Sequence, residues 1–332
     1  MLGYLVFKTH CFLRTQAIRM SYNLKKSKFH PEEAILVFGA PRSGTTWLAE
    51  VLSAPTGSTL ILEPLKLAHL QHLGYTENPY IQPTAKDKTT YEYFYKIFSG
   101  KIADGYNTYY THLLKVLNTK QWVIKFIKAN RLLPWILENF HFTQKPVFII
   151  RHPCGVVYSQ MKHPFVSKPL TIPEDDLKAL KVIFGEIPEV VKKIKTRAGI
   201  KALTWVIDNY IPLHYWKPEN LIVVPYERLV LDGGKELKRI YSEWGMNVPQ
   251  EALLHLRKRS KEARGWSEFD RRGRKKLGTW KKHLSSDEIE EILSIVHSFG
   301  FEEFSEEIEP EYEMLLQHLI HSTKYVIDAG SK

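Results

Sequence analysis

The sequence predicts an α/β fold of three layers, in which a mostly parallel central sheet carries helices on both faces. Two observations lead to this prediction. Short, continuous apolar runs recur along the chain, as expected for strands that are buried on both faces. Segments with helical periodicity separate these runs, which is the alternation that builds a parallel sheet. The chain has 332 residues, 44% of them hydrophobic, and can bury a full core as one large domain.

Each predicted strand is a short apolar run that stops at a turn-forming or charged residue. The strands cover residues 34–39, 58–64, 121–126, 146–150 and 220–227. Helical patterns cover residues 45–53, 131–140, 155–161, 235–245 and 285–301, with several short helices between 65 and 118 and more between 172 and 216. Pro188 and Pro212 are expected to be helix boundaries, and the serines at 285–286 provide a cap for the late helix.

Five polar side chains fall at or just beyond the ends of predicted strands. They are Arg42, Glu63, Lys125, Arg151 and Tyr226. Ligands of open parallel sheets bind at the carboxyl ends of the strands. The sequence therefore predicts one site at this edge of the sheet, built from residues far apart in the chain.

The stretch GAPRSGTTW, from Gly39 to Trp47, has the Gly-x-x-x-x-Gly spacing of a nucleotide phosphate loop. It follows a predicted strand and precedes a predicted helix, so backbone N–H groups and a helix N-terminus can face an anion. This makes the predicted fold P-loop-like. The lysine that usually follows the second glycine is replaced by Thr45, and Arg42 inside the loop can supply the positive charge instead. The alternative is a glycine-rich turn with no catalytic meaning.

A second motif, FIIRHPCGVVYSQM, places Arg151 at a strand end and Ser159 eight residues later. Eight residues are about two helical turns, so the hydroxyl can face the same pocket as the guanidinium. The pair can hold a second phosphate.

These motifs resemble those of the sulfotransferases that use 3′-phosphoadenosine-5′-phosphosulfate (PAPS). PRSGTTWL resembles their 5′-phosphosulfate loop, RHPCGVVYS their 3′-phosphate motif, and LGTWKKHLSSDEIEEI (277–292) their C-terminal Gly-x-Trp-Lys segment. The three follow one another in the family's order. The resemblance implies a sulfotransferase domain over residues 31–305, with an N-terminal extension at 1–30 and a C-terminal tail at 306–332.

The resemblance also implies roles for individual residues. The 5′-phosphosulfate would be held by Arg42, Ser43, Gly44, Thr45 and Thr46. The adenine would stack on Trp47 and meet Tyr226 at its edge. The 3′-phosphate would be held by Arg151 and Ser159, with help from Arg274 and Lys275 of the basic segment. That segment departs from the family pattern because Gly273 precedes Arg274.

For catalysis, the resemblance implies that Glu63 is the general base, because the Glu-Pro pair resembles that of the carbohydrate and tyrosylprotein branch. Burial near an apolar strand end disfavours the charged form of a carboxyl group, which suits proton abstraction near neutrality. Lys125 is expected to contact the bridging oxygen or the sulfuryl group, with a structural ion pair as the alternative. His141, His152 and His163 are weaker candidates for the base.

No metal ion is expected. The sequence shows no clear cluster of metal ligands, and a transferred sulfuryl group carries less negative charge than a phosphoryl group, so cationic side chains can replace a bridging divalent ion.

The expected acceptor is a small molecule or a carbohydrate with a hydroxyl or amine group. A P-loop kinase or NTPase is the alternative, but it would need an aspartate where Arg151 stands. A non-catalytic anion binder on the same fold is a third.

The net charge of +11 is concentrated between residues 257 and 282, where twelve basic residues face three acidic ones. Such a segment suits a small polyanion, an acidic polymer or a solvated helical face. PAPS carries two anionic groups, which gives the segment a local explanation, and no aromatic-interleaved basic repeat indicates nucleic acid.

The remaining features concern location. Two cysteines, Cys11 and Cys154, fit a reducing compartment, so a cytoplasmic protein is expected. The first twenty residues are apolar but interrupted by basic residues, which predicts no transmembrane span. They are expected to form a docked or frayed helix, with an amphipathic helix on a membrane surface as the alternative.

Overall fold

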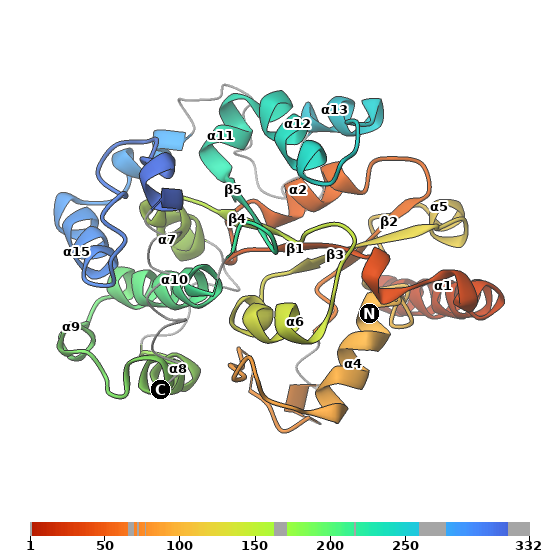
Figure 1. Cartoon of the computed structure of the whole chain (residues 1–332), viewed down its shortest axis with the longest axis horizontal. Helices are drawn as coiled ribbons and strands as arrows, with labels where there is room; N and C mark the ends of the chain where they lie inside the picture. The colour runs from red at the N-terminus through yellow and green to blue at the C-terminus, as the bar shows by residue number, and fades with distance from the viewer. Residues whose placement is uncertain are drawn as a thin grey trace.

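The computed structural model describes residues 2–65, 70–71, 73–76, 78–162, 171–215, 217–258 and 277–317. At its centre lies a five-stranded sheet in the order β2-β3-β1-β4-β5, with every neighbouring pair parallel. The strands are β1 (Ile35–Phe38), β2 (Ser58–Leu62), β3 (Gln121–Phe126), β4 (Val147–Ile150) and β5 (Ile222–Pro225). The three-layer arrangement with helices above and below the sheet is visible in Figure 1.

The sheet separates two hydrophobic cores, because successive side chains of a strand point to opposite faces. Ile35 and Val37 of β1 pack into one core, and Leu36 and Phe38 pack into the other. Both faces are therefore apolar, which explains why the strands appear in the sequence as continuous apolar runs rather than as an alternation.

Helices cover each face of the sheet (Figure 1). On one face lie α2 (Thr45–Leu52), α11 (Tyr226–Leu231), α12 (Gly233–Glu243) and α13 (Gln250–Leu256). The opposite side carries α4 (Lys88–Phe98), α6 (Leu133–Asn139), α7 (Pro153–Lys162), α8 (Glu174–Phe184), α9 (Glu189–Lys192), α10 (Arg197–His214) and α15 (Ser286–His297). Near the β2 edge lie α1 (Leu2–Lys25) and α5 (Leu113–Leu117). Short 3₁₀ helices are η1 (Lys26–Lys28), η2 (Pro31–Glu33), η3 (Asn130–Leu132) and η5 (Gly278–Lys282).

The predicted fold class is confirmed, and each of the five predicted strands forms within two residues of its expected bounds. The expected serine cap also forms: the Ser285 hydroxyl accepts from Glu288 N, and the Glu288 side chain returns the bond in a capping box. One boundary was wrong. Pro212 lies inside α10, where burial of Ile211 and Leu213 keeps the chain helical beyond the proline.

Residues that precede and follow the expected domain, 31–305, also pack against the rest of the protein. At the N-terminus, Cys11 and Ile18 of α1 are buried, and the Arg14 guanidinium donates to the Thr108 carbonyl at 2.9 Å. The first helix is therefore docked against the protein. At the other end, Tyr312 and Leu315 are each only 1% exposed. Within the described part of the chain, no helix is both long and apolar enough to cross a membrane.

Candidate active site

The glycine loop joins β1 to α2 and takes a backbone path that its two glycines allow. Gly39 has φ +154° and Gly44 has φ +94°, and a Cβ on Gly44 would lie 2.5 Å from the Tyr226 ring. Arg42 also adopts a positive φ, 76°, which is unfavourable for a residue with a side chain. The surrounding contacts must therefore hold the loop in this shape.

Three side chains from later in the sequence provide those contacts. Asn130 Oδ1 accepts a hydrogen bond from Gly39 N at 3.0 Å. Arg151 Nη1 donates to the Arg42 carbonyl at 2.9 Å, and Gln160 Nε2 donates to the Pro41 carbonyl at 3.0 Å. Residues of η3, of the turn after β4 and of α7 thus hold the backbone of the loop in place.

The position of Asn130 depends on a buried group of charges. The neighbouring Arg131 donates to Asp176 at 2.6 Å and to Asp208 at 2.9 Å, and all three side chains are buried. These ion pairs tie η3 to α8 and α10. Burial raises the pKa of Asp208 to about 6 despite the arginine, so desolvation outweighs the pairing for this carboxyl group.

The two predicted anion motifs meet directly. Arg42 Nε donates to Ser159 Oγ at 3.1 Å. Ile150 is opposite Pro225 in the parallel register of β4 and β5, so the next residues, Arg151 and Tyr226, are adjacent, and the guanidinium lies 4.5 Å from the centre of the Tyr226 ring. Because Arg42, Arg151 and Ser159 are only partly buried, an anion from solvent can reach them.

The loop also holds a buried hydroxyl without a partner. Ser43 is fully buried, and its Oγ makes no hydrogen bond to any residue that the structure describes. The N-cap residue of α2 is Gly44, which has no side chain to cap the helix. A buried donor without a partner costs free energy, about 1–3 kcal/mol. A bound oxyanion would satisfy it, so these residues fit the phosphosulfate that the sequence motif implies.

Lys125, Glu63 and Thr46 form a contact group beside the loop. Leu62 is opposite Lys125 in the β2–β3 register, so Glu63 follows directly at the carboxyl edge. The ammonium of Lys125, whose side chain is 3% exposed, lies 2.8 Å from Glu63 Oε1 and 3.0 Å from Thr46 Oγ1. Glu63 Oε2 accepts from Ile127 N at 3.2 Å, and its φ is +43°. The sequence analysis expected burial to disfavour the charged form of the Glu63 carboxyl group. The Lys125 ammonium opposes this effect, because a neighbouring positive charge stabilises the carboxylate.

The aromatic residues expected around the adenine adjoin the loop. The rings of Trp47 and Tyr226 meet edge to face with their centres 6.4 Å apart. Trp47 is 8% exposed and belongs to the core cluster on the α2 side of the sheet. Its stacking on adenine stays a prediction.

His152 has a structural environment that does not suit a base. Burial lowers the pKa of His152 to about 4. One ring nitrogen lies 2.8 Å from the Ser305 carbonyl and the other accepts from Cys154 N, while the ring stacks on Trp280. His141 is exposed on the segment that leads into β4. His163, Arg274 and Lys275 lie outside the described residues.

Sequence reasoning missed Asn130, Gln160 and Glu227. Glu227 is buried, accepts from His152 N at 3.1 Å and binds the Tyr312 hydroxyl. Its burial raises the pKa of the carboxyl group. Gln160 follows Ser159 directly, Glu227 follows Tyr226, and Asn130 lies four residues beyond β3. Proximity to recognised motif residues and strand ends was the available signal.

Within the described ranges, no group of three or more His, Cys, Asp or Glu residues is arranged to hold a metal ion. Cys154 is fully buried, and burial raises the pKa of its thiol to about 12, so it is not a reactive nucleophile.

Comparisons with known proteins agree with this arrangement of motifs. Residues 32–307 match the sulfotransferase domain family, and the chain belongs to this family. The protein is therefore a sulfotransferase, an enzyme of the family that uses PAPS as sulfuryl donor. No curated protein matches the sequence significantly.

Solved structures that match this chain include several sulfotransferases. Mouse sulfotransferase SULT7A1 complexed with PAP is 14% identical, with 91% of this chain and 93% of that chain covered and a TM-score of 0.45. The sulfotransferase domain of the Synechococcus PCC 7002 olefin synthase is 16% identical, with 81% and 94% covered and the same TM-score of 0.45. The sulfotransferase domain from the curacin biosynthetic pathway is 18% identical, with 68% and 79% covered and a TM-score of 0.39.

Proposed function

We propose that this enzyme transfers the sulfuryl group of PAPS to a hydroxyl or amine group of a small-molecule acceptor, with a carbohydrate hydroxyl as the first candidate. The observation that carries the proposal is the direct contact between the two anion motifs. Arg42 of the loop binds Ser159, and Arg151 binds the backbone of Arg42. Two guanidinium groups therefore lie together at one edge of the sheet, as a nucleotide with two anionic groups requires.

The loop and its partners would hold the donor. Arg42, Ser43 and the N-terminal residues of α2, Gly44 to Thr46, would bind the 5′-phosphosulfate, and Arg151 and Ser159 would bind the 3′-phosphate. Trp47 and Tyr226 would contact the adenine. When bound, PAPS supplies an activated sulfuryl group whose leaving group is a phosphate.

Glu63 would remove the acceptor proton. Its carboxylate is 29% exposed, so an acceptor can approach it, and its contact with Ile127 N fixes its orientation. The proton of the acceptor hydroxyl or amine moves to a carboxylate oxygen of Glu63 as the oxygen or nitrogen bonds to sulfur. Lys125 and Arg42 would stabilise the negative charge that grows on the leaving phosphate oxygen.

The acceptor would bind between Glu63 and the tyrosine-rich segment 75–111. Two contacts place this segment beside the proposed base: the Tyr93 hydroxyl donates to the Pro64 carbonyl at 3.4 Å, and Leu62 N donates to the Asn107 carbonyl at 2.8 Å. Burial raises the pKa of Tyr93 to about 12, so this phenol stays neutral and can donate hydrogen bonds. Aromatic rings with a polar group suit both sugars and phenols.

Ligand-dependent thermal stability, followed by turnover, tests the proposal. Adenosine 3′,5′-bisphosphate should raise the melting temperature, while ATP and GTP at equal concentration should not. Labelled PAPS is then tested with sugars, phenols, alcohols and amines. Stabilisation by ATP or GTP alone, or label transfer to none of these acceptors, would contradict the proposed reaction.

Metal removal separates this proposal from the P-loop kinase or NTPase. We expect transfer to persist in EDTA, because cationic side chains replace the bridging metal of phosphoryl transfer. A requirement for Mg²⁺ that is restored by adding the ion back would favour the kinase.

A further inference from the structure

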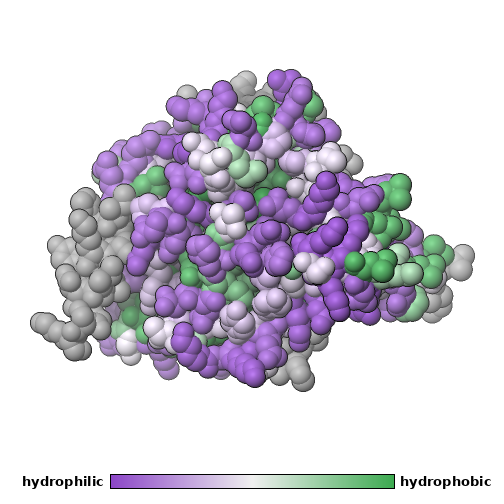
Figure 2. All heavy atoms as spheres, turned by 45° about the vertical axis from the view of Figure 1, so that its right-hand side comes forward, coloured by the Kyte–Doolittle hydropathy of each residue, from purple (hydrophilic) through white to green (hydrophobic). Residues whose placement is uncertain are grey.

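Helix α1 carries two apolar faces, and within the part of the chain that the structure describes only one of them is covered. The outer face exposes Val6, Leu13, Met20 and Leu24 by 62%, 62%, 70% and 80%, and the nearby Phe12 by 59%. The spacings of seven, seven and four residues align the first four side chains in one stripe along the helix. We call these four residues the outer stripe. Figure 2 shows hydrophobic side chains gathering at the edge of the molecule where α1 lies.

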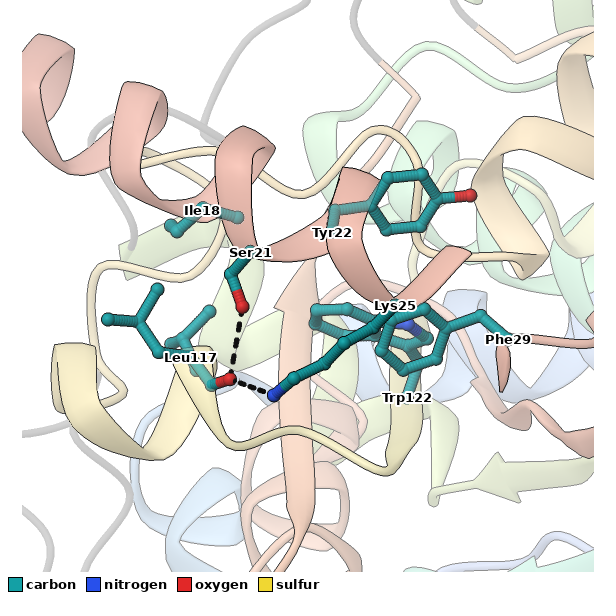
Figure 3. Close-up of a pocket in the computed structure, with 8 residues that line it drawn as sticks. Ile18, Ser21, Tyr22, Lys25, Phe29, Leu117 and Trp122 are labelled. Carbon is teal, nitrogen blue, oxygen red and sulfur yellow. Dashed lines mark hydrogen bonds between the residues drawn. The ribbon is translucent and has the colours of Figure 1, made fainter. Parts of the chain in front are cut away.

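The inner face holds α1 against the protein. Cys11 and Ile18 are buried there. In the last turns of the helix, the Ser21 hydroxyl and the Lys25 ammonium both donate to the Leu117 carbonyl, as Figure 3 shows. The helix cannot rotate to bury the outer stripe without losing these contacts, so the stripe is a fixed feature of the surface.

The charge of this region is of one sign. Residues 1–31 contain six lysines and arginines and no acidic residue. Lys8 and Arg19 on the helix and Lys26 and Lys28 just after it are exposed. An exposed apolar stripe about 27 Å long on a segment that is basic overall is the pattern of a helix that lies in the interface of an anionic membrane.

We propose that α1 binds the enzyme peripherally to an anionic lipid surface through the outer stripe. Val6, Leu13, Met20 and Leu24 enter the boundary between headgroups and acyl chains, and the exposed basic side chains meet the negatively charged headgroups. The charge of this segment favours an anionic lipid surface over a second copy of the chain as the partner of the outer stripe. A symmetric contact through the stripe would bring two acid-free, basic segments together, and their like charges would repel.

Vesicle flotation with the full chain tests the proposal. The protein should float with vesicles of phosphatidylcholine and phosphatidylserine, bind phosphatidylcholine alone weakly, and lose affinity as salt rises. The double variant Leu13→Glu/Met20→Glu should lower the partition coefficient about tenfold or more, because the stripe would no longer enter the interface. Leu13→Ser/Met20→Ser tests the loss of apolar area without added charge and should also reduce binding.

The matched control is Leu254→Glu, which changes a 51% exposed leucine on α13, away from α1 (Figure 1). It should bind vesicles as the wild type does. An unchanged melting temperature and nucleotide-induced shift would show that each variant is folded. The proposal is overturned if the stripe variants bind as tightly as the control, if the wild type ignores anionic vesicles, or if light scattering shows a dimer that the stripe variants abolish.

Discussion

Arg42 combines a strained backbone with contacts to the second motif. The surrounding structure holds this residue in place. It has a positive φ, its side chain donates to Ser159, and its carbonyl accepts from Arg151. We predict that Arg42→Ala weakens adenosine 3′,5′-bisphosphate binding and lowers transfer about 10²- to 10³-fold, because a cation facing the leaving phosphate is lost. Calorimetry and initial rates measure the two effects. Lys238→Ala on the exposed face of α12 is the control, and near-normal transfer by Arg42→Ala would remove Arg42 from the site.

Glu63 and Lys125 form an ion pair in which each partner has a separate proposed role. We predict that Glu63→Gln lowers kcat about 10²-fold or more while nucleotide affinity is kept, because the amide cannot accept the proton. The exposed Glu138→Gln on α6 is the matched control. An unchanged kcat would assign the base to another residue. A parallel loss of nucleotide affinity would instead indicate that the pair only shapes the loop through Thr46.

At the scale of the element, Gly44 decides whether the loop can pass into α2. We predict that Gly44→Ala abolishes nucleotide binding, because the added Cβ would lie 2.5 Å from the Tyr226 ring and displace either the ring or the loop. Gly245→Ala is a sharp control: this glycine also has a positive φ, +67°, but no atom lies within 4 Å of its added Cβ. It should cost only the backbone strain, about 1–2 kcal/mol. Denaturant unfolding and calorimetry on both variants separate the effect of backbone strain from that of the steric clash with Tyr226. Equal nucleotide affinity in the two variants would refute the role of the Tyr226 contact.

The strands and the glycine loop could be predicted from the sequence because their signals are local. Burial on both faces makes each strand an apolar run, and a parallel sheet brings Arg42, Glu63, Lys125, Arg151 and Tyr226 to one edge. The extension of α10 past Pro212 could not be predicted, since it depends on burial of Ile211 and Leu213 by other elements.

At the scale of the whole molecule, Tyr312 anchors the C-terminal segment to residues that adjoin the site. Its hydroxyl binds the buried Glu227, which holds the backbone of His152 next to Arg151. Desolvation raises the pKa of Glu227, and the Tyr312 hydrogen bond lowers it in part. A raised folded-state pKa contributes stability below the ordinary value of the group, and that stability is lost as pH rises through the folded-state value.

We therefore predict that Tyr312→Phe destabilises the protein more at pH 8 than at pH 4.5. Removal of the hydroxyl raises the pKa of Glu227 further, so the loss is greatest where the carboxylate is charged, about 1–3 kcal/mol. Denaturant unfolding at the two pH values measures it. Tyr95→Phe, at a tyrosine that is 47% exposed on α4, should change neither value. A loss that is equal or larger at acidic pH would contradict the assignment of the Glu227 contact.

The residues that sequence analysis missed are those whose partners lie far along the chain. The positions of Asn130 and Gln160, near a strand end and a motif residue, made them candidates, but no pattern in the linear sequence shows that they bind the backbone of Gly39 and Pro41. The docking of Tyr312 on Glu227 belongs to the same class. The motif residues could be predicted from their spacing in the sequence, whereas the residues that hold them in place could be identified only from the fold.

The long separation of these contacts also orders events during protein synthesis. The bonds to the loop join residues 91, 109, 117 and 119 positions apart. A growing polypeptide therefore lacks the full set of these bonds to the glycine loop until residue 160 has left the ribosome. Because Tyr226, the proposed contact for the adenine, comes later still, donor capture by the nascent enzyme has to wait for the second half of its translation.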